Sequence, residues 1–198
     1  MIDKSLEFYI DRYKKFRKFE YIRDEKLKKI LYQYAWYTYF LFYLFDKIQD
    51  EELKNFMAHT TIIYIGSIIE AVVFYYASTK LVDSKSKRRY LELEEFKKVQ
   101  DLKKCENLFV CELVKKEVSL NDSINFHSLI NWLKDKKIIS QEIIDKIDFI
   151  RKKRNLIHIN VLKTESELDL ILELEQIFIY MKDILDFVEI KICWLDEE

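Results

Sequence analysis

The chain contains no proline and a single glycine, Gly66, among its 198 residues. Turns and β-bulges depend on these two residue types, so their near absence favours long uninterrupted helices. Apolar residues make up 49% of the chain and charged residues 35%, which excludes a disordered polypeptide. The sequence therefore predicts an all-α protein, a helical bundle of about six or seven helices in one domain that covers residues 1–198.

Apolar residues recur at helical spacing along most of the chain. Polar stretches at 80–89 and 118–125 indicate loops, and no strand is strongly signalled. The expected helices cover residues 3–19, 24–47, 50–79, 91–116, 126–136, 141–160 and 164–194. The helix at 50–79 is apolar on nearly all sides, which is typical of the central helix of a bundle. The helices within 1–48 are interpreted as an extension of the core domain.

Charge and cysteine content limit the location and the kind of site. The formal net charge of -1 argues against a protein that binds nucleic acid over its whole surface, but a local basic site remains open. Cys105, Cys111 and Cys193 form no paired motif, and the chain has only three histidines. A cytoplasmic protein without a metal or other cofactor is expected. Residues 31–45 are apolar, but they are shorter than a membrane span and predict a buried helix, so no membrane partner is expected.

A basic cluster lies in the segment IDFIRKKRNLIHI, residues 147–159. On a helix, Arg151 and His158 would lie about 20° apart round the axis and ~10 Å apart along it. Arg154 and His158 would be direct neighbours at positions i and i+4, with Asn155 beside them. Cations on one stripe repel one another, so the stripe needs an anion. That anion would be a carboxylate within the fold or a phosphate from outside.

The pattern Arg-x-x-Arg-Asn-Leu-Ile-His resembles the R-x(4–6)-H signature of the HEPN family. Counted from Arg151 the spacing is R-x6-H, inside the family range, whereas from Arg154 it is R-x3-H, which is shorter. The segment GSIIEA at 66–71 is similar to an earlier helix of these domains, and FHSLINWLKDKKIIS is similar to the turn before the motif helix. The likeness covers roughly residues 58–180.

The resemblance implies a two-fold homodimer whose motif helices form one composite cleft for RNA. Catalytic members of the family cleave RNA without a metal. By this likeness His158 would be the acid/base group, and Arg151 would hold the phosphate. Arg154 would share either task or brace the site, and Asn155 would orient the phosphate or the imidazole. The implied function is an endoribonuclease of toxin–antitoxin or phage-defence type.

Other charged residues are candidates for supporting this site. Glu70 is the only charge between His59 and Lys80, so it should reach solvent or pair with Arg151 or Arg154. Further phosphate contacts are predicted for Lys152 and Lys153 and for the basic loop, Lys85, Lys87, Arg88 and Arg89. The tyrosine-rich helix at 32–43 is expected to serve as core or dimer surface, and no role is assigned to His59 or His127.

Two alternatives to an enzyme remain. The first is a non-catalytic HEPN-like module that binds RNA or protein, for example an antitoxin or a nucleotidyltransferase-type partner. In some toxin members a tyrosine two residues after the motif histidine is modified by such a partner. Asn160 stands at that position here, which puts this mode of silencing in doubt. The second alternative is a helical scaffold in which the motif occurs by chance.

Overall fold

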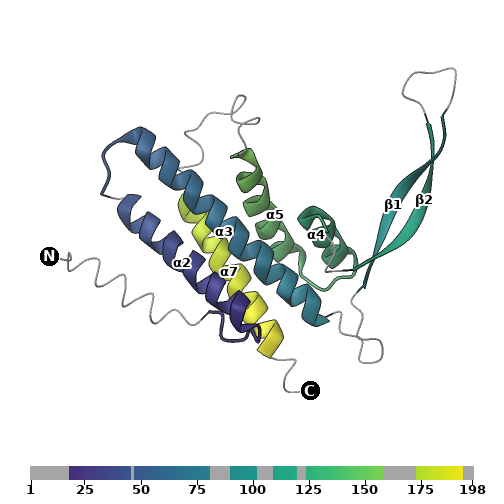
Figure 1. Cartoon of the computed structure of the whole chain (residues 1–198), viewed down its shortest axis with the longest axis horizontal. Coiled ribbons are helices and arrows are strands. Elements are labelled where there is room, and N and C mark those ends of the chain that lie inside the picture. The colour runs from purple at the N-terminus through teal and green to yellow at the C-terminus, as the bar shows by residue number, and fades with distance from the viewer. Residues whose placement is uncertain are drawn as a thin grey trace. The chain divides into compact units, whose positions relative to one another are not determined.

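The computed structural model describes residues 18–45, 47–80, 90–101, 109–119, 124–157 and 173–193. For residue 80 and the two strands it describes the backbone only. These residues form five helices and one two-stranded antiparallel hairpin (Figure 1). The chain divides into two compact units. The first contains residues 1–76 and 139–198, and the second contains residues 77–138.

Four helices build the first unit, and their directions alternate along the chain (Figure 1). They are α2 (Glu25–Phe45), α3 (Glu51–Lys80, whose last four residues belong to the second unit), α5 (Gln141–Leu156) and α7 (Leu174–Cys193). The helical body that the sequence predicted is confirmed in these residues.

Side-chain contacts fix which helices are neighbours in this unit. Near the start of α2, the backbone N–H of Arg23 donates to the Tyr75 hydroxyl of α3 at 2.9 Å. On α5, Lys146 binds Asp183 of α7 at 2.8 Å, so α5 is paired with α7 along its length. Phe42 of α2 packs on the α7 aromatic ring of Phe178, with 4.6 Å between ring centroids. Helix α7 therefore contacts both α2 and α5, and α3 contacts the residues that precede α2.

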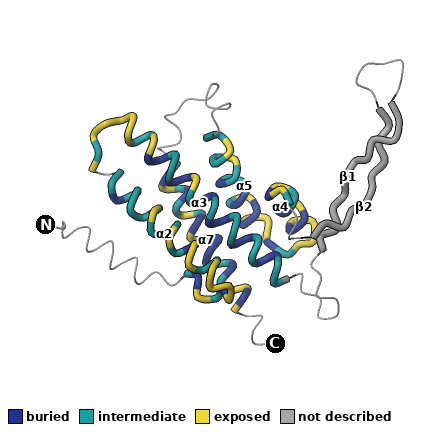
Figure 2. The backbone as a smooth tube through the Cα atoms, viewed as in Figure 1, coloured by how far each residue is buried: buried dark blue, intermediate teal, exposed yellow. Residues whose placement is uncertain are grey.

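The core of the first unit centres on α3. Figure 2 shows buried positions along most of this helix, and its fully buried side chains include Ile62, Ile65, Ile69 and Val73. On α5 the buried positions are Ile143, Ile144, Ile147 and Ile150, which is one helical face. Each such side chain contributes roughly 1.5–3 kcal/mol by leaving water. This face fixes the rotation of α5 and hence the direction of its basic residues.

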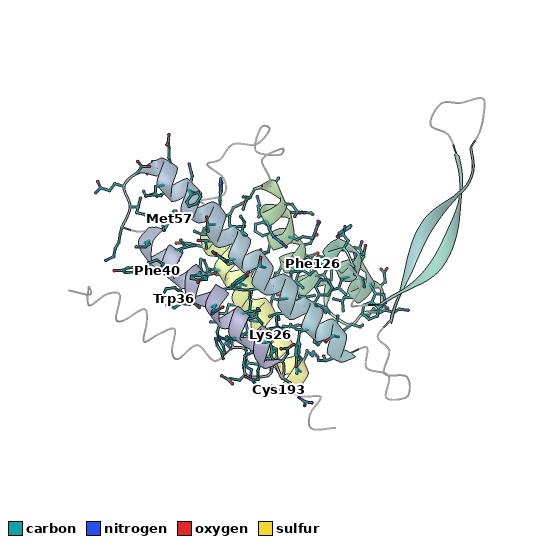
Figure 3. The ribbon with its side chains drawn as sticks, in the orientation of Figure 1. Lys26, Trp36, Phe40, Met57, Phe126 and Cys193 are labelled. Carbon is teal, nitrogen blue, oxygen red and sulfur yellow. The ribbon has the colours of Figure 1, made fainter. Side chains whose placement is uncertain are left out.

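The aromatic residues of α2 pack on one another and on neighbouring helices. Tyr34 and Tyr64 of α3 meet edge to face with 5.2 Å between centroids. Trp36 and Phe40 stack along α2, with centroids 5.5 Å apart (Figure 3). Tyr43 is buried, whereas Tyr37 is 40% exposed, so only part of residues 32–43 belongs to the core, and the dimer surface predicted there stays a prediction.

One helix among the described residues, α3 over Glu51–Thr79, is long and apolar enough to cross a membrane. In its most apolar window, 56% of the residues are buried inside the protein. That burial is typical of the central helix of a bundle, although length and composition alone also fit a span.

The second unit contains a β-hairpin where the sequence predicted a helix over residues 91–116. Strand β1 (Tyr90–Asp101) pairs with β2 (Phe109–Ser119) in antiparallel register, from Tyr90 opposite Ser119 to Asp101 opposite Phe109. The register shifts by one residue between Lys98 and Gln100, which is a bulge. The prediction of no sheet is wrong here. Glu, Lys and Leu in this segment form helices well, whereas the run Leu-Glu-Leu-Glu at 91–94 alternates with the period of a strand.

Helix α4 (Phe126–Asp135) follows the hairpin and begins where the sequence predicted. The side chain of Asn125 caps it by accepting the backbone N–H of His127 at 2.9 Å. At its other end, Lys137 adopts a left-handed conformation with φ 54°. The N–H of Ile138 then bonds to the carbonyl of Leu133 at 3.0 Å, which closes a Schellman motif without the usual glycine.

The ends of the other helices lie close to the sequence predictions, with one exception. The expected helices at 24–47, 50–79 and 141–160 correspond to α2, α3 and α5. The exception is the last helix: α7 starts at Leu174, and the start expected near 164 lies outside the described residues. Residues 158–172, and residues 1–17 with most of the expected first helix, lie outside the described residues. The count of six or seven helices is not reached in the described part, which has five.

Candidate functional site

The basic cluster lies in the last two turns of α5. Ser140 occupies the N-cap position in extended conformation without a capping hydrogen bond from its side chain, and Ile157 is the C-cap. The helix therefore ends two residues before His158, and His158 itself lies outside the described residues. Arg151, Arg154 and Asn155 are in the helix as predicted, with Asn155 exposed and both arginines partly buried.

Arg154 reaches across to α3. Its guanidinium donates to the Glu70 carboxylate in a close ion pair. Its aliphatic stem crosses α3 at Gly66, where an added Cβ would lie 2.6 Å from the Arg154 Cδ and 3.2 Å from its Cγ. The only glycine of the chain therefore provides the space through which Arg154 meets Glu70. Of the partners predicted for Glu70, Arg154 is the one that the structure confirms.

Arg151 stays on its own helix. Its Nε and Nη2 both contact Oδ1 of Asp148, at 2.8 and 2.7 Å. Lys152 binds the other oxygen of the same carboxylate at 2.8 Å. Burial raises the pKa of Asp148, but hydrogen bonds from Lys152 and Arg151 outweigh it and hold the pKa below its ordinary value. Asp148 is thus ionised at neutral pH and balances both cations.

The two lysines of the cluster differ in exposure. Lys153 turns toward α7, where it binds Glu173 at 2.5 Å and lies over the Phe149 ring at 5.5 Å. Its side chain is 18% exposed, against 66% for Lys152. Lys152 is therefore the better placed of the two for the phosphate contact predicted from the sequence.

Each of the four basic residues 151–154 pairs with a carboxylate within the fold, in the part of the chain that the structure describes. Carboxylates within the fold, one of the two kinds of anion that the sequence suggested, thus neutralise the basic stripe. Asp148 and Glu173 were not singled out from the sequence. Asp148 could have been found, because it stands three residues before Arg151 on the same helix.

The predicted residues of the basic loop lie outside the described residues; they are Lys85, Lys87, Arg88 and Arg89. Within those residues, no group of three or more His, Cys, Asp or Glu side chains could hold a metal ion. His59 Nε2 and Asn55 Oδ1, one turn apart on α3, are buried and have no hydrogen-bond partner there.

Comparisons with protein-family models, with curated proteins and with solved structures found no match for this chain. The resemblance to HEPN domains therefore stays a prediction from the motif and the helical context.

Proposed function

We propose that this chain is a metal-independent endoribonuclease of toxin–antitoxin or phage-defence type, which acts in the cytoplasm as a homodimer with a composite RNA cleft. In this proposal Arg151 binds the scissile phosphate and His158 transfers a proton. Arg154 is a positioning residue, and Asn155 lies at the rim of the site.

The observation that supports different roles for Arg151 and Arg154 is that their side chains are held by different contacts. Arg154 is held between Gly66 and Glu70 of another helix and cannot leave without breaking that packing. Arg151 binds Asp148 one turn away on its own helix, and its side chain is 17% exposed against 32% for Arg154. A phosphate that replaces Asp148 as its partner would break no ion pair between helices. The R-x6-H spacing from Arg151, not the short spacing from Arg154, is then the functional one.

The chemistry follows from these side chains. The RNA 2′-hydroxyl loses its proton to a base and its oxygen attacks the adjacent phosphorus. The bond from phosphorus to the 5′-oxygen breaks, and that oxygen takes a proton from an acid. The product is a 2′,3′-cyclic phosphate. Arg151 presents a planar fork of donors to the phosphoryl oxygens, where negative charge develops in the transition state.

The test is cleavage of a mixed-sequence single-stranded RNA in EDTA, with the matching DNA as a substrate that lacks the nucleophile. His158→Ala and Arg151→Ala should each lower the rate by roughly 10²–10⁴-fold while the fold persists. Arg154→Ala should act mainly on stability. Lys182→Ala removes an exposed positive charge of α7 and serves as the matched control. An inert wild type, or equal activity of the Arg151 and control variants, contradicts the proposal.

A second candidate is a non-catalytic module that binds RNA or a protein such as an antitoxin or a nucleotidyltransferase-type partner. One observation favours it: all four cations of the cluster already have carboxylate partners. On this reading the cluster holds α3, α5 and α7 together. Loss of stability without loss of RNA cleavage in the Arg151 and His158 variants would support it.

A further inference from the structure

In the part of the chain that the structure describes, the hairpin of the second unit is a sheet with two unpaired edges. It consists of β1, with 12 residues, and β2, with 11, which lie side by side (Figure 1). An isolated two-stranded hairpin is only marginally stable in water, and an unpaired edge offers its N–H and C=O groups to another strand. A further strand on one of these edges would therefore stabilise the hairpin.

The charges of β1 are arranged symmetrically about its central phenylalanine. Two acidic residues precede this position and two basic residues follow it, in the run Glu94, Glu95, Phe96, Lys97, Lys98. The whole run lies in the regular part of the ladder, because the register shifts only after Lys98. Positions at equal distances on the two sides of Phe96 thus carry opposite charges.

This symmetry is complementary to the same edge of a second copy. When two identical strands pair antiparallel about a two-fold axis, the residue on the axis stands opposite itself, and residues at equal distances from the axis stand opposite each other. With the axis at Phe96, each Glu95 stands opposite a Lys97 of the other copy, and each Glu94 stands opposite a Lys98. Opposite charges at such positions stabilise an antiparallel ladder, whereas like charges destabilise it.

The charges also select one edge and one register. Every other axis position on β1, and every axis position on β2, brings at most one acidic position opposite a basic one. With the axis at Phe96, the neighbouring positions are compatible as well, because Leu93 stands opposite Val99 and Glu92 stands opposite Gln100. No like charges meet between Glu92 and Gln100 in this register. The edge of β1 is thus self-complementary over nine residues centred on Phe96.

We propose that the edge of β1 is a docking surface for the β1 edge of a second copy of this chain, so that two hairpins join into one four-stranded antiparallel sheet. The strand order is β2, β1, β1, β2. Leu113 stands opposite Phe96 within each hairpin, so a row of four apolar residues crosses the joined sheet. The inference concerns the hairpin alone and does not rest on the proposed ribonuclease activity.

Charge reversal tests the register. One double variant, Glu94→Lys with Glu95→Lys, makes the run entirely basic, and the other, Lys97→Glu with Lys98→Glu, makes it entirely acidic. Each carries like charges at all four pairs and should self-associate at least about 10-fold more weakly than the wild type in sedimentation equilibrium. A one-to-one mixture has opposite charges at all four pairs and should form a mixed dimer with about wild-type affinity.

The mixture separates docking from hairpin folding, because each chain in it has the same hairpin as it has alone. Lys116→Glu is the matched control, since it reverses a charge on β2 and leaves the β1 edge unchanged; it should associate like the wild type. Circular dichroism of each variant reports whether the helices persist.

The second measurement locates the axis by a cross-link. It uses a chain in which the three native cysteines, Cys105, Cys111 and Cys193, are replaced by serine. Phe96→Cys then places two thiols at the axis, where opposite Cα atoms of antiparallel strands lie ~4.5–5.5 Å apart, within reach of a disulfide. Mild oxidation should link two copies through this position, whereas Val114→Cys on β2 should give no link.

Three results would overturn the proposal: a monomeric wild type, wild-type association of both reversed variants, or no link through Phe96→Cys. The charges would then only keep the edge in water. A dimeric wild type that cleaves RNA, beside reversed variants that associate equally well, overturns this inference and leaves the proposed function intact. Recovery of association in the mixture, together with an inert wild type, supports the docking surface and contradicts the ribonuclease.

Discussion

Gly66→Ala tests the contact that fixes Arg154. At an ordinary helix position this change stabilises by about 1 kcal/mol, because alanine is the better helix former. At Gly66 the new methyl group would lie 2.6 Å from the Arg154 Cδ and 3.3 Å from its Cβ, so the arginine must move. The guanidinium cannot swing aside while it binds Glu70.

The expected change in the free energy of unfolding follows from three contributions. Overpacking typically costs roughly 1–3 kcal/mol. Loss of the ion pair costs about 0.2–1 kcal/mol, since the Arg154 and Glu70 side chains are 32% and 30% exposed. The helix propensity offsets about 1 kcal/mol of this. Gly66→Ala should therefore lower the free energy of unfolding by about 0.2–3 kcal/mol, and the middle of this range corresponds to a Tm lower by roughly 3–6 °C for a chain of this length.

A double-mutant cycle separates the clash from other effects of the substitution. In an Arg154→Ala background the crowding atoms beyond Cβ are gone, so Gly66→Ala should become stabilising by up to about 1 kcal/mol. The coupling between the two positions should reach about 2 kcal/mol. Urea unfolding followed by circular dichroism at the helix band measures all four proteins. Stabilisation of the wild type by Gly66→Ala, or additivity in the double variant, would refute the packing argument.

Three other predictions concern charge, backbone strain and assembly. The pKa of Asp148 lies below its ordinary value of 3.8, so its stabilising effect is present above that pH and is lost as the pH falls through the lower folded-state pKa. In the Asp148→Asn variant, the free energy of unfolding should fall less at acid pH than in the wild type, as measured by urea unfolding at several pH values. Lys137→Gly should stabilise the protein by about 1 kcal/mol in thermal unfolding, because the left-handed conformation at φ 54° is strained for lysine; a lower Tm would contradict this. Light scattering at micromolar concentration should give twice the chain mass of 24.3 kDa, and a monomer would count against the composite cleft.

The helical body could be predicted from the sequence because its signals are local and agree with one another. Apolar residues at helical spacing, capping residues such as Ser140 and the absence of proline all favour the same structure in α2, α3 and α5. The hairpin at 90–119 could not be predicted in this way. Its strands contain residues that also form helices well, and strand pairing between distant positions such as Tyr90 and Ser119 is not a local property.

The pairing of Glu70 was predictable because an isolated carboxylate on so apolar a helix needs a cation. The choice between Arg151 and Arg154 was not, because it depends on where two helices cross. The decisive residue is Gly66, whose missing side chain admits the stem of Arg154. A lone glycine within a long helical pattern was therefore a usable signal of close approach by another element.

The ion pairs of the cluster also indicate which of its cations a phosphate could bind most easily. Arg154 binds Glu70 on α3 and Lys153 binds Glu173 just before α7, so their release would loosen α5 from these two elements. Arg151 and Lys152 share Asp148 on their own helix, and their release changes no contact between helices. An incoming phosphate that displaces Asp148 leaves that carboxylate nearby, where it repels the phosphate and shortens its residence. In the proposed ribonuclease, such a site would favour brief binding and release of the RNA backbone over a stable complex.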